Sequence, residues 1–351
     1  MQRAAGSLPA VLPDGVHRLE LPTPFAIGPV SSYVLRGEPL TLVDPGPRMR
    51  QTREALERGL RDLRLRVEDV ELLVLTHQHH DHVGLAAEVR ERSGARVAGS
   101  ARLETYLAGF ERAMDRDDAY AVAMMVRHGI DADTRETLNQ VSRGFRHYSS
   151  GVTLDAVVSD GDALVAGGGT LRVFERPGHS PTDTVFLDAS DGLLVGGDHL
   201  LERISSNPIA HVPIDDRDPA AVAAGPDRPR PLVAYLASMA KTAEQDVALV
   251  LPGHGAPFGG HRELVEKRRD MHARRARRIL RAVDGRRTAA DMIAILWRQL
   301  PVTQHYLALS EVVGHLDLLA ADGLVREAER DDGVVIWTRP SRAARGARAA
   351  A

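Results

Sequence analysis

The most informative segment of this chain is Thr76-His77-Gln78-His79-His80-Asp81-His82-Val83-Gly84. It follows the apolar run 71–75, which is typical of a short buried strand, and it precedes 85–89, where a helical pattern begins. One tight turn between a strand and a helix therefore carries four potential metal ligands, His77, His79, Asp81 and His82. Histidines two apart in an extended loop can bind one ion, and the two residues at the start of the helix can face a second. A solvated polar loop is the alternative, but four such ligands in six positions are an unusual surface composition.

The spacing His77-x-His79-x-Asp81-His82 resembles the signature of the metallo-β-lactamase superfamily. Segments similar to the later ligand motifs of that family follow in the family's order: Pro177-Gly178-His179-Ser180, Gly196-Gly197-Asp198-His199 and Leu251-Pro252-Gly253-His254-Gly255. Upstream, Asp44 in the run 42–46 matches an early aspartate that supports the ligands in the family. Each later motif is weak alone, because a glycine-rich turn with one polar residue is an ordinary loop. Together, behind the first motif, they predict three further ligands, and the resemblance covers approximately residues 16–260.

The resemblance implies a binuclear metal centre. Its first ion would be bound by His77, His79 and His179, its second by Asp81, His82 and His254, and Asp198 would bridge the two. Zinc suits imidazole and carboxylate ligands of this kind, and iron or manganese tolerates the same set. Two divalent cations ~3.5–4 Å apart can share a hydroxide whose pKa falls to about 7, which makes it a nucleophile at neutral pH. Asp81 is the predicted catalytic residue, because it can bind a metal and also orient the hydroxide or pass its proton on.

Strand and helix patterns place the chain in the α/β class. The resemblance implies a four-layer αββα sandwich with the metals at one edge between the two sheets. We predict a catalytic domain over 11–260, in which 101–148 is a helical insertion. Three helical patterns and a hairpin over 261–340 look like a winged-helix module, and Thr288 is a plausible N-cap of its second helix. The Ala/Arg-rich stretch 341–351 is predicted to be disordered.

Composition narrows the class of protein. The chain has 351 residues, 43% hydrophobic and 26% charged residues and a formal net charge of −3, which is an ordinary globular balance. It has no cysteine, which excludes disulfides, thiolate metal sites and cysteine nucleophiles. We find neither the apolar core of an export signal nor the ~20 apolar residues of a membrane span, so a cytoplasmic protein with no membrane contact is expected.

Two segments leave alternatives open. The insertion 101–148 is either a helix pair packed on the sandwich or a lid over the metals, since its Met and aromatic residues make adaptable apolar walls. The segment 262–287 holds eleven Lys or Arg against four Asp or Glu. A solvated helix face is the simplest interpretation, and binding of RNA, coenzyme A or an acidic acyl carrier protein is the alternative. Aromatic residues, at 4%, are scarce for base stacking, which disfavours RNA.

Five other histidines near the motifs are not predicted to bind metal. These are His80, His199, His211, His261 and His272. Ser180, Thr182 and Asp183, directly after His179, are instead candidates for fixing the tautomer of an imidazole ligand.

Three functions fit these patterns. The first is hydrolysis of a thioester, ester or lactone of a small acyl substrate, as in glyoxalase II-like and lactonase members, whose bridging aspartate is matched by Asp198. The second is a metal-dependent endoribonuclease of the β-lactamase-like protein 2 type, which the C-terminal module resembles. The third is a non-hydrolytic role, such as a mononuclear-iron dioxygenase or a carrier-binding module. We favour the first, because a lid rich in Met and Phe suits an apolar acyl group better than a polyanion.

Overall fold

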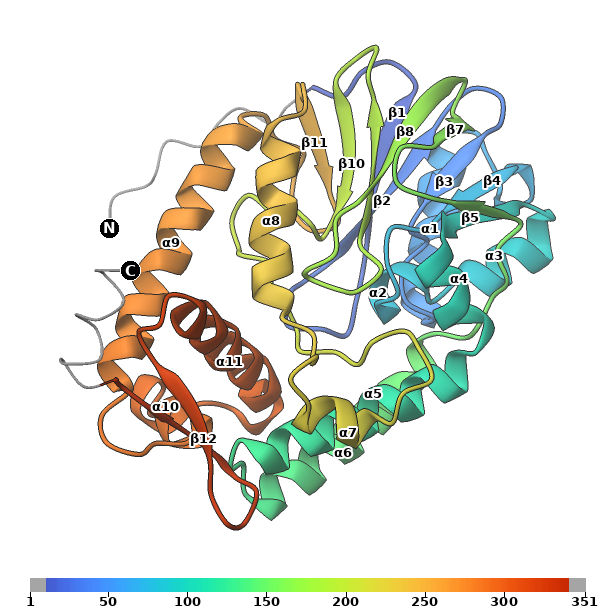
Figure 1. The fold of residues 1–351 in the computed structure, drawn as a ribbon. Helices are drawn as coiled ribbons and strands as arrows, with labels where there is room; N and C mark the ends of the chain where they lie inside the picture. Colours follow the sequence, from blue (N-terminus) through green and yellow to red (C-terminus); the bar gives the residue numbers. More distant parts are fainter. Residues whose placement is uncertain (1–10, 341–351) are drawn as a thin grey trace. The chain divides into compact units, whose positions relative to one another are not determined.

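The computed structural model describes residues 11–340, which form two compact units (Figure 1). The first unit contains the chain up to Ala113, then Phe145–Ser206 and Ser238–Val265. The second contains Met114–Gly144, Asn207–Ala237 and the chain from Glu266 onward. The sequence predicts one boundary near residue 260 instead, so the extent of the functional domains stays a prediction. The tail predicted to be disordered, 341–351, lies outside the described residues.

The first unit is built on two β-sheets. The larger sheet has the order β1 (Val16–Leu21), β2 (Val30–Leu35), β3 (Thr41–Val43), β4 (Leu72–Val74), β5 (Arg96–Ser100) and β6 (Ala156–Val158). The second has the order β11 (Leu249–Pro252), β10 (Leu193–Gly197), β9 (Thr184–Asp188), β8 (Gly169–Glu175) and β7 (Ala163–Ala166). β7 and β8 pair as an antiparallel hairpin. Its turn contains Gly167 and Gly168, whose φ angles of 59° and 77° favour glycine.

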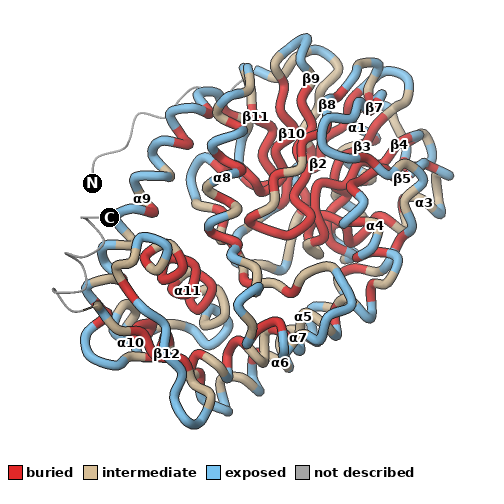
Figure 2. Tube along the Cα trace, viewed as in Figure 1, coloured by how far each residue is buried: buried red, intermediate tan, exposed pale blue. Residues whose placement is uncertain are grey.

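Alternate residues of both sheets form one apolar core. Tyr33 and Leu35 of β2 contribute from the first sheet, and Leu171 and Val173 of β8 from the second, in the period of two that a pleated strand imposes. β2 is buried along its whole length, as Figure 2 shows. The two sheets therefore face each other across this core and form the inner layers of the predicted sandwich.

Helices cover the sandwich. α1 (Arg50–Asp62) packs on β1, while α3 (Ala86–Ser93) and α4 (Ala101–Ala108) pack on β5. On the second sheet, residues of α8 (Pro231–Ala243) reach the loops beside β8 and β10: Ser238 donates to the Pro177 carbonyl, and Thr242 bonds to His199. The observed fold is the predicted α/β sandwich, with helices flanking both sheets.

The second unit has its own core. It is formed by helices α5 (Phe110–Arg127), α6 (Ala132–Phe145), α7 (Pro219–Ala224), α9 (His261–Ala282), α10 (Ala289–Leu296) and α11 (His305–Ala321) and by the antiparallel pair β12 (Arg326–Glu329) and β13 (Val335–Thr338). α5, α6, α8 and α9 each contribute residues to both units. The predicted cap is confirmed, because Thr288 Oγ1 accepts from the Asp291 N–H at 3.1 Å. The long connection between β10 and α8 contains the short helix α7.

α11 is buried on nearly every side. Its buried residues are Ala308, Leu309, Ser310, Val312, Val313, Gly314, His315, Leu316, Asp317 and Leu319. A winged-helix protein that reads nucleic acid needs an exposed third helix, because that helix enters the major groove. The helices and hairpin are present as expected, whereas their winged-helix character stays a prediction. Among residues 11–340, no helix combines the length and the apolar character needed to cross a bilayer.

The second unit is expected to lose stability at acidic pH through a buried histidine pair. His272 Nδ1 lies 3.2 Å from His315 Nε2, and both side chains are buried. Burial lowers the pKa of His272 to about 3 and that of His315 to about 4; Arg275 lowers both pKa values further, and Arg268 lowers that of His272. Glu311 is the facing carboxylate, and it pairs with Arg275 at 3.4 Å. Below about pH 6.5, these two histidines are therefore protonated in the unfolded chain but stay neutral in the folded chain.

The free energy of unfolding should keep its full value above about pH 6.5 and should decrease as pH falls towards 4, by about 1 kcal/mol per pH unit for each histidine. Thermal unfolding of the wild type and of the double variant His272→Leu/His315→Leu, at about pH 7.5 and about pH 5, checks this. Replacing both partners leaves no unpaired nitrogen, so the variant should fold and should lose less stability on acidification. Equal losses in both proteins would contradict the prediction.

Candidate metal centre

The turn after β4 holds the first histidines in place through Asp44. Asp44 lies at φ 49°, directly after β3, and is buried. Its Oδ1 accepts from the Thr76 N–H at 2.9 Å, and its Oδ2 accepts from Thr76 Oγ1 at 2.7 Å and lies 2.8 Å from His82 Nδ1. Because Nδ1 of His82 faces Asp44, Nε2 is the nitrogen left to bind a metal. The early aspartate thus takes the supporting position that the sequence predicts.

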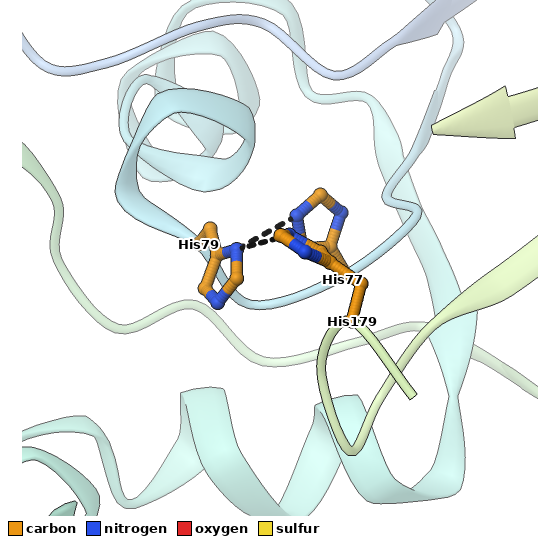
Figure 3. Close-up of side chains that lie close together, drawn as sticks. All are labelled: His77, His79 and His179. Carbon is orange, nitrogen blue, oxygen red and sulfur yellow. Dashed lines mark hydrogen bonds between the residues drawn. The ribbon is translucent and has the colours of Figure 1, made fainter. Parts of the chain in front are cut away.

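Three histidines converge on one point, as Figure 3 shows. His79 Nδ1 lies 3.1 Å from His77 Nε2 and 2.9 Å from His179 Nε2. His77 and His79 come from the turn after β4, whereas His179 comes from the loop between β8 and β9, about a hundred residues later. The structure therefore brings the three predicted ligands of the first ion together across the two sheets.

A second group contains Asp81 and His82 at the start of α2 (His80–Val83) and His254 after β11. His254 Nε2 lies 3.2 Å from Asp81 Oδ2, and its Nδ1 faces the Pro29 carbonyl at 2.9 Å. These are the three residues predicted for the second ion.

Asp198 lies between the two groups. Its Oδ1 is 3.5 Å from His82 Nε2, and its Oδ2 is 3.5 Å from His179 Nε2 and 3.6 Å from His254 Nε2. Gly197, at φ 47°, permits this approach, since a Cβ there would lie 2.8 Å from Thr76 Oγ1. All seven predicted site residues thus lie in one cluster of the first unit. Their roles as ligands are a proposal.

The cluster suits divalent cations. His82 Nε2, Asp198 Oδ1 and His254 Nε2 are buried and make no hydrogen bond within the described residues 11–340. Buried polar atoms without partners are costly, and a shared cation would satisfy all three. A Cβ at Gly253 would clash with Asp198 and lie 2.6 Å from His82 Cε1, so position 253 must be glycine for these side chains to converge.

Electrostatics agree with this fit. Burial lowers the pKa of His77 and His79 well below its usual value, so both imidazoles are neutral and keep a lone pair for a metal. Burial also lowers the pKa of His82, but the carboxylates of Asp198 and Asp44 outweigh it and hold that pKa well above the usual value. The position of His82 therefore favours a positive charge, which a divalent cation would supply.

A pair of polar residues joins the two ligand loops. Gln78, between His77 and His79, donates its N–H to Thr182 Oγ1 at 3.0 Å, and Thr182 Oγ1 donates to Gln78 Oε1. Thr182 belongs to the loop of His179. The Gln78–Thr182 clamp therefore fixes the spacing between the first two histidines and the third. The sequence points to Thr182 as a supporting residue, but nothing in it pairs this residue with Gln78.

Further residues stabilise the loop of His179 without joining the ligand groups. Ser180 donates from its hydroxyl and its N–H to Asp183, at 2.6 and 2.9 Å. Burial raises the pKa of Asp183 to about 6. The other histidines form no part of the ligand groups found among residues 11–340. His80 faces Ser149 Oγ at 2.5 Å, and His199 faces Thr242 Oγ1 at 2.9 Å.

Removal of the Thr182 hydroxyl should weaken binding of the first metal. Thr182→Val has a similar shape but cannot bond to Gln78, so the histidines on the two loops lose their fixed spacing. We expect metal affinity to fall roughly 10–100-fold, as is typical for residues that support ligands. Competition with a chromogenic chelator measures this directly. Thr182→Ser keeps the hydroxyl and is the matched control, and an unchanged affinity of Thr182→Val would show that the clamp does not position the ligands.

The fold and this cluster together define a metal-dependent hydrolase of the αββα sandwich type. The profile of the Metallo-beta-lactamase superfamily matches residues 26–254, and the chain belongs to that superfamily. A probable metallo-hydrolase of Bacillus subtilis (strain 168), YqjP, is 31% identical over 310 residues, which cover 88% of this chain and 93% of that protein.

Solved structures agree. A Beta-lactamase domain protein from Burkholderia ambifaria has a TM-score of 0.78 at 29% identity, covering 96% of this chain and 97% of that one. A metallo-beta-lactamase family protein from Thermus thermophilus has a TM-score of 0.73 at 26% identity, covering 94% of this chain and all of that one. Both likenesses extend over nearly the whole chain and therefore include the C-terminal elements.

Proposed function

We propose that this hydrolase cleaves a thioester, ester or lactone of a small acyl substrate at a binuclear centre. The position of Asp198 carries the proposal, because its two oxygens face histidines of both ligand groups at 3.5–3.6 Å. Zinc fits this set of imidazoles and carboxylates, and iron or manganese is the alternative. Coenzyme A or an acyl carrier protein is the proposed carrier of the acyl group.

The ions, when bound, would polarise the scissile carbonyl and lower the pKa of a water molecule. Residues of the chain position the predicted ligands for this reaction. His77, His79 and His179 are fixed by the Gln78–Thr182 clamp, and His82 is oriented by Asp44. No serine nucleophile is required.

Asp81 is the proposed catalytic residue. Burial raises the pKa of its carboxyl, but His82 and His254 outweigh burial and lower that pKa to about 2. Asp81 is therefore a carboxylate at neutral pH. Its oxygens can accept a hydrogen bond from the attacking water and hold it in line with the carbonyl carbon.

A metal-dependent endoribonuclease is the alternative function. The excess of cations along α9 favours it, since Lys267, Arg274 and Arg281 are exposed and make no ion pair within the described residues. The burial of α11 and the net charge of −3 count against it, because the helix that would read nucleic acid is covered. We therefore place acyl hydrolysis first.

A turnover panel tests the proposal. Metal-loaded protein is assayed with acyl-coenzyme A, acyl-glutathione, a homoserine lactone and single-stranded RNA, before and after chelation. We expect acyl turnover that chelation removes and added metal restores. Asp81→Ala should abolish turnover with the fold intact. RNA cleavage that depends on Asp81, with no acyl turnover, would reverse the order of the two functions.

A further inference from the structure

An aromatic cluster lies in the first unit, outside the ligand groups. The centroid of the Phe25 ring lies 5.3 Å from that of the Phe145 ring and 5.8 Å from that of the Tyr148 ring, and both pairs pack edge to face. The ring centroids of Phe145 and Tyr148 are 6.1 Å apart. Ile27 shares the loop of Phe25, and we call these four residues the aromatic wall.

The aromatic wall is unusually exposed for such residues. Phe145 is 37% exposed and Ile27 is 41% exposed, while Phe25 and Tyr148 are half-buried. Edge-to-face contacts hold the rings in fixed orientations, so the exposed surface is ordered before anything binds. An ordered apolar surface open to water is characteristic of a binding site rather than of an incompletely packed core.

Both ends of the aromatic wall lie beside residues that would bind the second ion. The loop of Phe25 and Ile27 ends at Pro29, whose carbonyl lies 2.9 Å from His254 Nδ1, and Val30 forms a β-bridge with His254. On the other side, η2 (Arg146–Tyr148) packs against α2, which carries Asp81 and His82. The wall therefore connects the two chain segments that would hold the second ion.

The apolar side chains of the wall favour an apolar ligand. Phe25, Ile27 and Phe145 have no polar side-chain atom, so they can bind only by apolar contact. The nearby cation Arg48 already donates from its Nε to the His147 carbonyl at 3.1 Å. These three side chains offer a charged phosphate no hydrogen-bond or ionic partner, whereas contact with them would remove an alkyl or aryl group from water.

We propose that the aromatic wall binds the apolar acyl group of the substrate next to the second ion. The proposal rests on the function proposed above and narrows it: the preferred substrates carry medium-chain alkanoyl or aryl groups, and acetyl esters and thioesters are poor substrates. The carbonyl would lie at the ions while the acyl chain extends along Phe145 and Phe25. The carrier would then point away from the wall.

Chain-length selectivity tests the proposal. Wild type and Phe145→Ser are assayed with acetyl, hexanoyl and benzoyl thioesters of one carrier. We expect kcat/KM of the variant to fall about tenfold or more for hexanoyl and benzoyl, mainly through KM, and to change little for acetyl. Phe145→Leu should keep most of the preference. Val157→Ser, at a residue of β6 that is 51% exposed, is the control for loss of any exposed apolar residue.

Binding without turnover separates this proposal from the proposed function. Calorimetry with an S-hexyl thioether of the same carrier should show weaker binding to Phe145→Ser and to Ile27→Ser, the latter on the opposite loop, than to wild type. If no acyl substrate were turned over but this binding pattern were observed, the proposed hydrolysis would be wrong, whereas the aromatic wall would still bind acyl groups. Equal losses for acetyl and hexanoyl substrates, or displacement of the thioether by an RNA oligonucleotide, would overturn the wall as an acyl site.

Discussion

Asp198→Ala should lower the bound metal from two ions per chain towards one and reduce hydrolysis by on the order of 10³-fold or more. The reason is the position of the carboxylate between the two histidine groups, 3.5 Å from His82 Nε2 and from His179 Nε2. Without it, two cations would lie close together with no anion between them. Each cation would then weaken the binding of the other.

Elemental analysis of the purified variant, together with its turnover, checks this prediction. Ser206 donates its hydroxyl to the Asp198 carbonyl, so the main chain at this position stays anchored when the side chain is removed. Asp246→Ala, at a fully exposed carboxylate that pairs with Arg262, is the matched control. Two ions retained by Asp198→Ala would show that Asp198 does not bridge them.

The site could be predicted from the sequence because its ligands are grouped in short motifs. His77, His79, Asp81 and His82 fall in one turn, and the other three follow glycines, at 178, 197 and 253. Gly197 and Gly253 explain why the motifs have this form. Any larger residue would meet Thr76 at the first position and Asp198 at the second. The glycines are therefore part of the site, since they allow three loops to approach one point.

Other features could not be predicted because they depend on contacts between distant segments. Gln78 and Thr182 are about a hundred residues apart, and only the arrangement of the two sheets places them together. The same holds for Phe25 and Phe145, which are ordinary loop and helix-end residues in the sequence. Periodicity could predict α11, but not that residues on nearly all its faces are buried. A pattern of apolar residues predicts the inner face of a helix and does not indicate what covers its polar face.

Asp44→Asn should reduce hydrolysis by on the order of 10²–10³-fold and weaken metal binding roughly 10–100-fold, although Asp44 is not one of the seven predicted ligands. The carboxylate of Asp44 accepts hydrogen bonds from the Thr76 N–H and from Thr76 Oγ1, and it also faces His82 Nδ1. Its two oxygens therefore act only as acceptors. An asparagine must direct its NH2 group at one of these donors. Either the turn after β4 shifts, or His82 changes tautomer and loses Nε2 as a ligand.

The substitution isolates this effect from backbone strain. Asp44 has a φ of 49°, where most residues are strained, but asparagine tolerates that conformation as well as aspartate does. Asp44→Asn should therefore fold, and its thermal unfolding without metal should stay close to that of the wild type. Asp44→Ala removes the acceptor and adds backbone strain, so it should lose stability as well as metal. If Asp44→Asn bound both metals with wild-type affinity, the orientation of His82 would not depend on Asp44, and the second ligand group would need another explanation for its geometry.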